Sequence, residues 1–193
     1  MKVKNPKKNG PRPIRSGSIT KPPRLPVSTL GLEPQLRVGF GNDIHRLVSG
    51  RPLILGGVRI PFHKGPAGHS DGDALSHAVT DALLGAAALG DIGTHFPDTS
   101  PKWHNVSSLH FLRRTRELLE RAGYDIENLD ATISLERPKL RPHILKMRMK
   151  VAAALGLKIT QVSVKAKTGE RLDSIGRGEA IRADAVALIT RAV

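Results

Sequence analysis

Apolar residues recur every three to four positions in residues 74–86 and 107–122, which is the spacing of one face of a helix. The first of these helices begins after a cap at Asp71 or Asp73, and the second after a cap at Ser107 or Ser108. A third helix is predicted from Pro142 to about Leu155, because proline opens helices and Gly156 follows. The buried stripe of the first helix is expected to contain Leu75, Val79, Ala82, Leu83 and Ala86.

Other segments are short and apolar or alternate between apolar and polar residues, as strands do. They predict strands within residues 37–41, 51–62, 128–135, 161–167 and 181–190. Residues 63–73 and 90–105 are rich in Gly, His and Asp and predict long loops, the first of them mobile. This order predicts an α/β chain of the α+β kind, a two-layer sandwich with a mixed sheet and helices on one face.

Composition limits the possible chemistry. The 193 residues contain no cysteine, which excludes disulfides, thiolate zinc sites and cysteine catalysis, so a metal site must use His, Asp and Glu. No apolar run is long enough to span a bilayer. Half of the net charge of +14 and half of the prolines fall in residues 1–36, which predict a disordered, basic, Pro-rich arm before a folded domain at 37–193. The arm could be a transit peptide, a tether to nucleic acid or a membrane surface, or the result of a misplaced start codon, but a dispensable tail is favoured.

Asp43 and His45 lie two positions apart at the end of a predicted strand, so their side chains point the same way. His77 falls in the first turn of the next helix, and Asp81 lies four residues later on the same helix face. Two histidines and a carboxylate leave a coordination position open, as in catalytic zinc sites, and Asp81 could bond the outer nitrogen of His77. The competing interpretations are an Asx turn with a surface His45 and a partly buried helix histidine at His77.

Four stretches then match a known family: "RVGFGNDIH", "HSDGDALSHAVTDALLGAAALGDIGTHFPDT", "ERPKLRPHI" and "VKAKTGERLDSIGRGEAI". The chain from Arg37 to Val193 resembles the 2-C-methyl-D-erythritol 2,4-cyclodiphosphate synthases of the non-mevalonate route to isoprenoid precursors. The resemblance implies a metal-dependent phosphorus–oxygen lyase that cyclises 4-diphosphocytidyl-2-C-methyl-D-erythritol 2-phosphate and releases CMP. It also implies a cytoplasmic enzyme, or a plastid one if the arm is a transit peptide.

The resemblance assigns roles to individual residues. It implies zinc or another divalent metal at Asp43, His45 and His77, and a second ion, Mg²⁺ or Mn²⁺, at Glu170. His69 and Thr168 are implied as catalytic residues. The residues expected to bind substrate are Asp43, Ile44, His45, His69, Ser70, Asp91, Ile92, Gly93, Phe96, Pro97, Asp98, Thr99, Ser100, Leu135, Glu136, Arg137, Pro138, Lys139, Leu140, Arg141, Lys167, Thr168, Gly169, Glu170, Ser174 and Arg177.

The resemblance and the layout of the chain also predict a homotrimer with active sites shared between subunits. Its sheets would face the axis and would cover the apolar alternation of Ile181, Ala183, Ala185, Ala187 and Ile189. Two other functions remain open from the residues alone. A zinc hydrolase would use the same metal triad with water, and a nucleic-acid-binding module would use the basic arm, although only six aromatics are available for stacking.

Overall fold

The computed structural model describes residues 35–68 and 70–192, and every element named below lies within them. The predicted arm, except for Gln35 and Leu36, lies outside the described residues. Within the described part, no helix is both long and apolar enough to cross a membrane.

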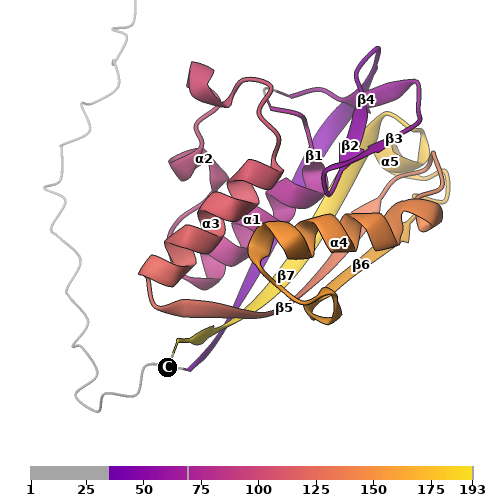
Figure 1. Cartoon of the computed structure of the whole chain (residues 1–193). Helices are drawn as coiled ribbons and strands as arrows, with labels where there is room; N and C mark the ends of the chain where they lie inside the picture. The colour runs from indigo at the N-terminus through magenta and orange to yellow at the C-terminus, as the bar shows by residue number, and fades with distance from the viewer. Residues whose placement is uncertain (1–34, 69, 193) are drawn as a thin grey trace, which may run out of the picture. The chain divides into compact units, whose positions relative to one another are not determined.

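The centre of the fold is a five-stranded mixed sheet in the order β4-β1-β7-β5-β6 (Figure 1). Strand β1 is antiparallel to β4 on one side and to β7 on the other, and β7 is antiparallel to β5. Only β5 and β6 run parallel, and the chain between them contains a helix, as the crossover of a parallel pair usually does. The strands are β1 (Leu36–Ser49), β4 (Lys64–Pro66), β5 (Tyr124–Ser134), β6 (Val162–Lys167) and β7 (Ala180–Arg191).

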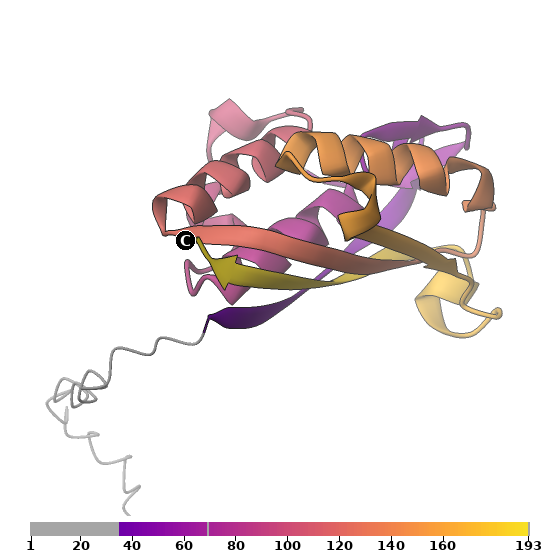
Figure 2. The same cartoon turned by 60° about the horizontal axis from the view of Figure 1, so that its bottom comes forward.

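Three helices cover one face of this sheet and leave the other face bare (Figure 2). They are α1 (Ala74–Ala86), α3 (Leu109–Arg121) and α4 (Ile144–Leu155). A separate hairpin is formed by β2 (Leu53–Leu55) and β3 (Val58–Ile60), and it turns at Gly56 and Gly57. The short helical elements are α2 (Ile92–His95), α5 (Asp173–Gly176), η1 (Pro101–Trp103), η2 (Arg141–His143) and η3 (Ile159–Gln161). The predicted two-layer arrangement with helices on one face is therefore confirmed.

Both segments predicted as long loops contain regular structure. Within 63–73, residues Lys64–Pro66 form β4, whose backbone pairs with Leu47–Ser49 of β1. Within 90–105, α2 and η1 form single turns. Prediction missed β4 because a three-residue edge strand containing Gly65 and Pro66 has no apolar alternation, and backbone pairing alone defines it.

The prediction for the face of β7 was wrong. Ile181, Ala183 and Ala185 are buried under the helices, as are the next alternate residues, Ala187 and Ile189. Small side chains are needed there because α1 packs directly on β1 and β7. The bare face instead exposes apolar side chains of β1 and β7, namely Val38 at 68%, Phe40 at 58%, Ile44 at 58% and Val186 at 44% of their surface.

Helix α1 approaches β1 unusually closely, and two glycines of β1 make this possible. A Cβ atom built on Gly39 would lie 1.9 Å from the carbonyl oxygen of Ala82, and one on Gly41 would lie 2.2 Å from that of Ala78. Neither position can hold a side chain without moving the helix. The alanines of α1 and the glycines of β1 thus bring the two backbones together, and His77 lies on the same helix.

Asp73 ties the start of α1 to the β2–β3 turn. Its carboxylate is fully buried and accepts hydrogen bonds from the N–H groups of Gly56 at 2.8 Å, Gly57 at 2.7 Å and Ser76 at 3.0 Å. It is also the N-cap of α1, which resolves the choice between Asp71 and Asp73. One buried carboxylate therefore satisfies donors from two elements.

We expect Asp73→Ala to lower the free energy of unfolding by about 3 kcal/mol or more, because it leaves several buried N–H groups without an acceptor. Asp125→Ala is the control, since that carboxylate is half exposed and its contact with Arg116 is 3.4 Å long. The control should change stability by no more than about 0.5 kcal/mol. Urea unfolding of the metal-free proteins measures both, and a loss below about 1 kcal/mol for Asp73→Ala would contradict this account.

Candidate metal centre and adjoining pockets

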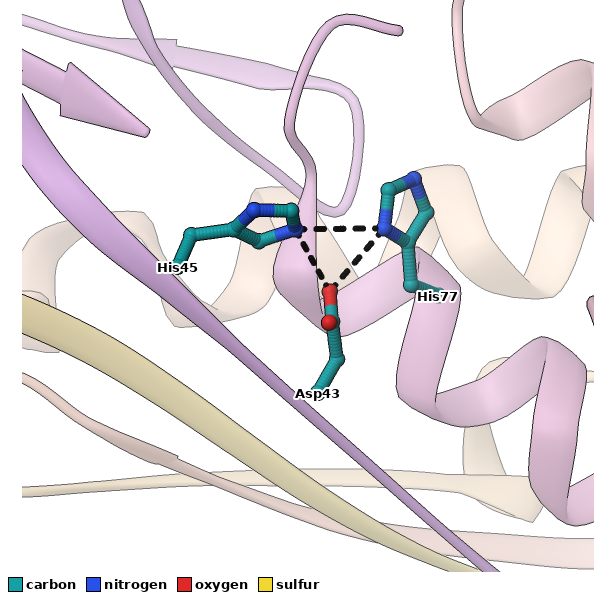
Figure 3. Close-up of side chains that lie close together, drawn as sticks. All are labelled: Asp43, His45 and His77. Carbon is teal, nitrogen blue, oxygen red and sulfur yellow. Dashed lines mark hydrogen bonds and ion pairs between the residues drawn. The ribbon is translucent and has the colours of Figure 1, made fainter. Parts of the chain in front are cut away.

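Asp43, His45 and His77 converge as predicted (Figure 3). The Asp43 Oδ2 atom lies 2.8 Å from His45 Nε2 and 2.9 Å from His77 Nδ1, and the two ring nitrogens are 3.4 Å apart. Asp43 and His45 project from β1 on the side facing α1, where alternate strand residues share one face. The close approach of α1 brings His77 to them. The three residues form a cluster that could hold a divalent metal.

The donor chemistry of this cluster fits a cation. The Nδ1 atom of His45 lies 2.8 Å from the carbonyl oxygen of Ala67. A carbonyl only accepts, so Nδ1 carries the hydrogen of the neutral ring, whose Nε2 then directs its lone pair at the Asp43 carboxylate. Two acceptors at 2.8 Å repel each other unless a metal ion or a proton lies between them. This arrangement, in which the outer nitrogen is bonded to a carbonyl, is common in metal-ligating histidines.

The electrostatics agree with this arrangement. Burial raises the pKa of Asp43, but its hydrogen bonds to His45 and His77 and their charges outweigh burial and hold that pKa well below its usual range. For His45, burial lowers the pKa, and the bond and charge of Asp43 outweigh burial and raise it. Asp43 is therefore kept in the ionised form that binds metals, and its charge favours a cation at this position.

The predicted bond between Asp81 and His77 was wrong. The Asp81 carboxylate accepts the N–H of Ile92 at 2.7 Å and so anchors the start of α2. The outer nitrogen of His77, Nε2, instead lies 2.9 Å from Ser108 Oγ and 3.1 Å from Ser70 Oγ. Helical spacing places Asp81 one turn along from His77, but the ring of His77 turns toward the start of α3.

A cavity of about 420 Å³ opens beside the metal centre. Its lining includes His45 and His77 and most of the residues predicted to bind near the metal: Ser70, Ile92, Gly93, Phe96, Pro97 and Asp98.

Gly68, Trp103 and Phe111 also line this cavity, and prediction missed all three. Phe96 stacks on Phe111 at 4.6 Å between ring centroids, and Trp103 meets both rings edge-on. The only sequence signal for this aromatic cluster was the interval of seven and eight residues between Phe96, Trp103 and Phe111. The chain between them has no periodic pattern that would support a shared helix face.

A second pocket, of about 400 Å³, gathers the residues expected around the nucleotide and the second ion. It is lined by Ala166 and by the predicted residues Leu135, Pro138, Lys139, Leu140, Arg141, Lys167, Thr168 and Glu170. The hydroxyl of Thr168 donates to the Glu170 carboxylate. No described residue lines both this pocket and the one beside the metal centre. The predicted site thus falls into two separate halves within one chain.

The remaining predicted residues that the structure describes do not line either of these two pockets. Glu136, Arg137 and Arg177 border a third pocket, Ile44 and Ser174 border a fourth, and Gly169 borders a fifth with Thr168. Asp91 caps α2 by accepting the N–H of Thr94 at 2.8 Å. Thr99 and Ser100 lie just before η1, outside the lining of the metal-side cavity. His69 lies outside the described residues.

The chain is similar to known proteins over most of its length. The model of the YgbB family matches residues 36–190. The 2-C-methyl-D-erythritol 2,4-cyclodiphosphate synthase of Salinibacter ruber is 57% identical over 157 residues, which cover 81% of this chain and all of that protein. A solved structure of 2C-methyl-D-erythritol-2,4-cyclodiphosphate synthase in its CDP-bound form is 42% identical with a TM-score of 0.73, and the match covers 79% of this chain and 99% of that one. The CDP complex of IspF from Plasmodium falciparum is 34% identical with a TM-score of 0.74, over 84% and 100% of the two chains.

We expect His77→Ala to abolish stoichiometric divalent-metal binding, because two remaining ligands hold a metal far more weakly than three. His63→Ala is the control, since His63 is an exposed histidine that borders a different pocket. Metal content per chain, measured by elemental analysis after loading and gel filtration, should be about one in the control and near zero in His77→Ala. Retention of a full equivalent by a folded His77→Ala protein would remove His77 from the ligand set.

Proposed function

The chain belongs to the YgbB family, and from this premise we propose that it cyclises 4-diphosphocytidyl-2-C-methyl-D-erythritol 2-phosphate to 2-C-methyl-D-erythritol 2,4-cyclodiphosphate and releases CMP. It is then a metal-dependent phosphorus–oxygen lyase of isoprenoid precursor biosynthesis by the non-mevalonate pathway. The observation that carries the proposal is the Asp43, His45, His77 cluster beside a cavity, in a chain that covers the whole of a synthase at 57% identity.

The reaction needs little acid–base chemistry. An oxygen of the substrate's 2-phosphate bonds to the β-phosphorus, while the bond from that phosphorus to the oxygen bridging the α-phosphorus breaks. The bridging oxygen keeps the electron pair and leaves as part of CMP. The attacking group is already an anion within the same molecule, so its position and the neutralisation of charge dominate the barrier.

Each half of the site has a part in this scheme. Asp43, His45 and His77 would hold one divalent ion, proposed to be zinc, which would supply positive charge to the reacting phosphate oxygens. Phe96, Trp103 and Phe111 give the cavity an apolar wall suited to the carbon skeleton, and Ser70 and Asp98 offer polar groups for its hydroxyls. The polar groups fix the orientation of the substrate, and the apolar wall excludes water.

The second pocket suits the cytidine diphosphate part. Lys139, Arg141 and Lys167 line it and bring positive charge to a polyanionic ligand. Glu170 is proposed to bind the second ion, Mg²⁺ or Mn²⁺, and Thr168 to contact a phosphate once its hydroxyl turns away from Glu170. His69, from the segment just before Ser70, is proposed as the other group that acts on the substrate.

We also propose a homotrimer in which two neighbouring subunits form each active site. The metal-side cavity and the nucleotide-side pocket have no described lining residue in common, although one substrate must reach both. The bare sheet face exposes apolar side chains such as Val38, Phe40 and Ile44, which burial between subunits would remove from water. This face replaces the alternation of Ile181 to Ile189 that the sequence suggested.

The alternative of a zinc hydrolase has no support among the relatives, which carry the name of the synthase. The folded domain at 37–193 is proposed to carry the whole activity, with residues 1–36 as a dispensable arm. That domain is proposed to work in the cytoplasm.

Incubation of the metal-loaded protein with the cytidine diphosphate substrate should give CMP and the cyclic diphosphate in equal amounts. Phosphorus NMR of the products separates a ring, with two coupled diphosphate signals, from the linear phosphates that hydrolysis would yield. Asp43→Ala should lower turnover by at least about 10³-fold through loss of the metal ligand, whereas His63→Ala should retain it. Linear products from the wild-type protein would refute the proposed cyclisation.

Mixing two inactive variants tests whether sites are shared. Asp43→Ala damages only the metal half and Glu170→Ala only the nucleotide half. If each site draws one half from each of two neighbouring subunits, every mixed trimer has one intact site in three. Random refolding of equal amounts should then restore about a quarter of the wild-type activity.

Mass spectrometry of the refolded mixture must show mixed trimers, and each variant refolded alone is the control. If each subunit has a complete site of its own, every site carries one lesion. Mixed trimers without recovered activity would therefore overturn the shared arrangement.

A further inference from the structure

A chain of hydrogen bonds leads from the candidate metal ligand His77 to a carboxylate that the proposed mechanism does not use. The Nε2 atom of His77 lies 2.9 Å from the hydroxyl oxygen of Ser108, and that hydroxyl lies 2.5 Å from Oδ1 of Asp71. Oδ2 of Asp71 accepts the backbone N–H of Ser108 at 3.0 Å. Ser108 is fully buried. The loop before α1 and the start of α3 are thus joined directly behind the His77 ring.

The directions of these bonds follow from the hydrogens available. An ionised Asp71 can only accept, and it takes both the N–H and the O–H of Ser108. A serine hydroxyl has one hydrogen, so Ser108 has none left for His77 and must accept from it. The hydrogen of the neutral ring therefore lies on Nε2, and the lone pair lies on Nδ1, which faces Asp43 and His45.

A hydrogen on Nδ1 of His77 instead would block the position where a metal ion could bind. Nδ1 of His77 lies 2.9 Å from the Asp43 carboxylate, so a hydrogen on Nδ1 would form a strong bond to Asp43. That bond would occupy both the nitrogen and the oxygen that the metal needs. Two carboxylates thus compete for the ring hydrogen, Asp43 directly at one nitrogen and Asp71 through Ser108 at the other.

We propose that Ser108 and Asp71 are positioning residues that hold the hydrogen of His77 on Nε2, so that Nδ1 is free to bind a divalent metal. The inference rests on the proposed metal-dependent function, but it concerns which nitrogen is protonated in the metal-free protein. Ser70 is the weaker partner of Nε2, because its oxygen is 3.1 Å away and also lies 3.4 Å from the N–H of Gly72. The buried Ser108 hydroxyl is the closer acceptor. Asp71 holds Ser108 in place by accepting both its O–H and its backbone N–H.

The test uses the full-length protein freed of metal by a chelator and then titrated with Zn²⁺ against a chelating indicator. Ser108→Ala removes the hydroxyl but keeps the backbone N–H that bonds Asp71. We expect a 10- to 100-fold weaker zinc affinity, roughly the usual effect of losing such a supporting bond. Ser107→Ala is the matched control, since Ser107 is the exposed neighbour, and it should bind zinc as the wild type does.

Two-bond ¹H–¹⁵N correlation spectra of the histidine-labelled, metal-free proteins at pH 8 report the hydrogen itself. The wild-type His77 ring should have its hydrogen on Nε2, and Ser108→Ala should shift the population toward Nδ1. A purely structural role of Ser108 would lower the melting temperature of the metal-free protein without changing this ratio.

The outcomes separate this inference from the proposed function. A hydrogen on Nδ1 in the wild-type protein overturns the inference, even if Ser108→Ala does not fold. Unchanged affinity and an unchanged spectrum in a folded Ser108→Ala protein also overturn it, while zinc binding by the wild type leaves the proposed metal site standing. Failure of the wild type to bind any divalent metal would count against the proposed function instead.

Discussion

The short separation between the backbones of α1 and β1 is the constraint on which the candidate metal centre depends. Helices usually pack on sheets with a layer of side chains between the backbones. Here Gly39 and Gly41 remove that layer, and the first of them leaves a Cβ position only 1.9 Å from a helix carbonyl. The ring of His77 can reach Asp43 and His45 only because the helix lies this close. A methyl group on either glycine would lift the helix and separate the ligands, so the precision of the site comes from packing rather than from the ligands themselves.

The same constraint explains the composition of the core around it. Along β7 the residues beneath α1 are mostly alanines, and along α1 the buried face is rich in alanine as well. Bulkier side chains are also fully buried, namely Leu75 and Leu83 on α1 and Ile181 and Ile189 near the two ends of β7. Asp73 then fixes the start of the helix to the β2–β3 turn. The strand glycines set how close α1 lies, and the cap sets where it begins.

Periodicity in the sequence foretold what local spacing can determine. The two-residue interval between Asp43 and His45 predicted that their side chains point to the same side of a strand. The apolar stripe from Leu75 to Ala86 predicted the buried face of α1. It did not reveal which face of β7 is covered, because alternation defines two faces without saying which one meets the helices. It pointed to Asp81, one helical turn from His77, as a hydrogen-bond partner and gave no signal for Ser108, which is 31 residues away. Contacts of that kind depend on how the helices are placed in three dimensions.

The ligand atoms of the metal cluster are a carboxylate oxygen and two imidazole nitrogens, and the sequence contains no cysteine. Thiolate ligands are lost when peroxide or disulfide exchange oxidises the sulfur, and their metal is released with them. Imidazole and carboxylate groups are not substrates for that chemistry. A divalent ion held by these three residues would therefore not be released by thiol oxidation.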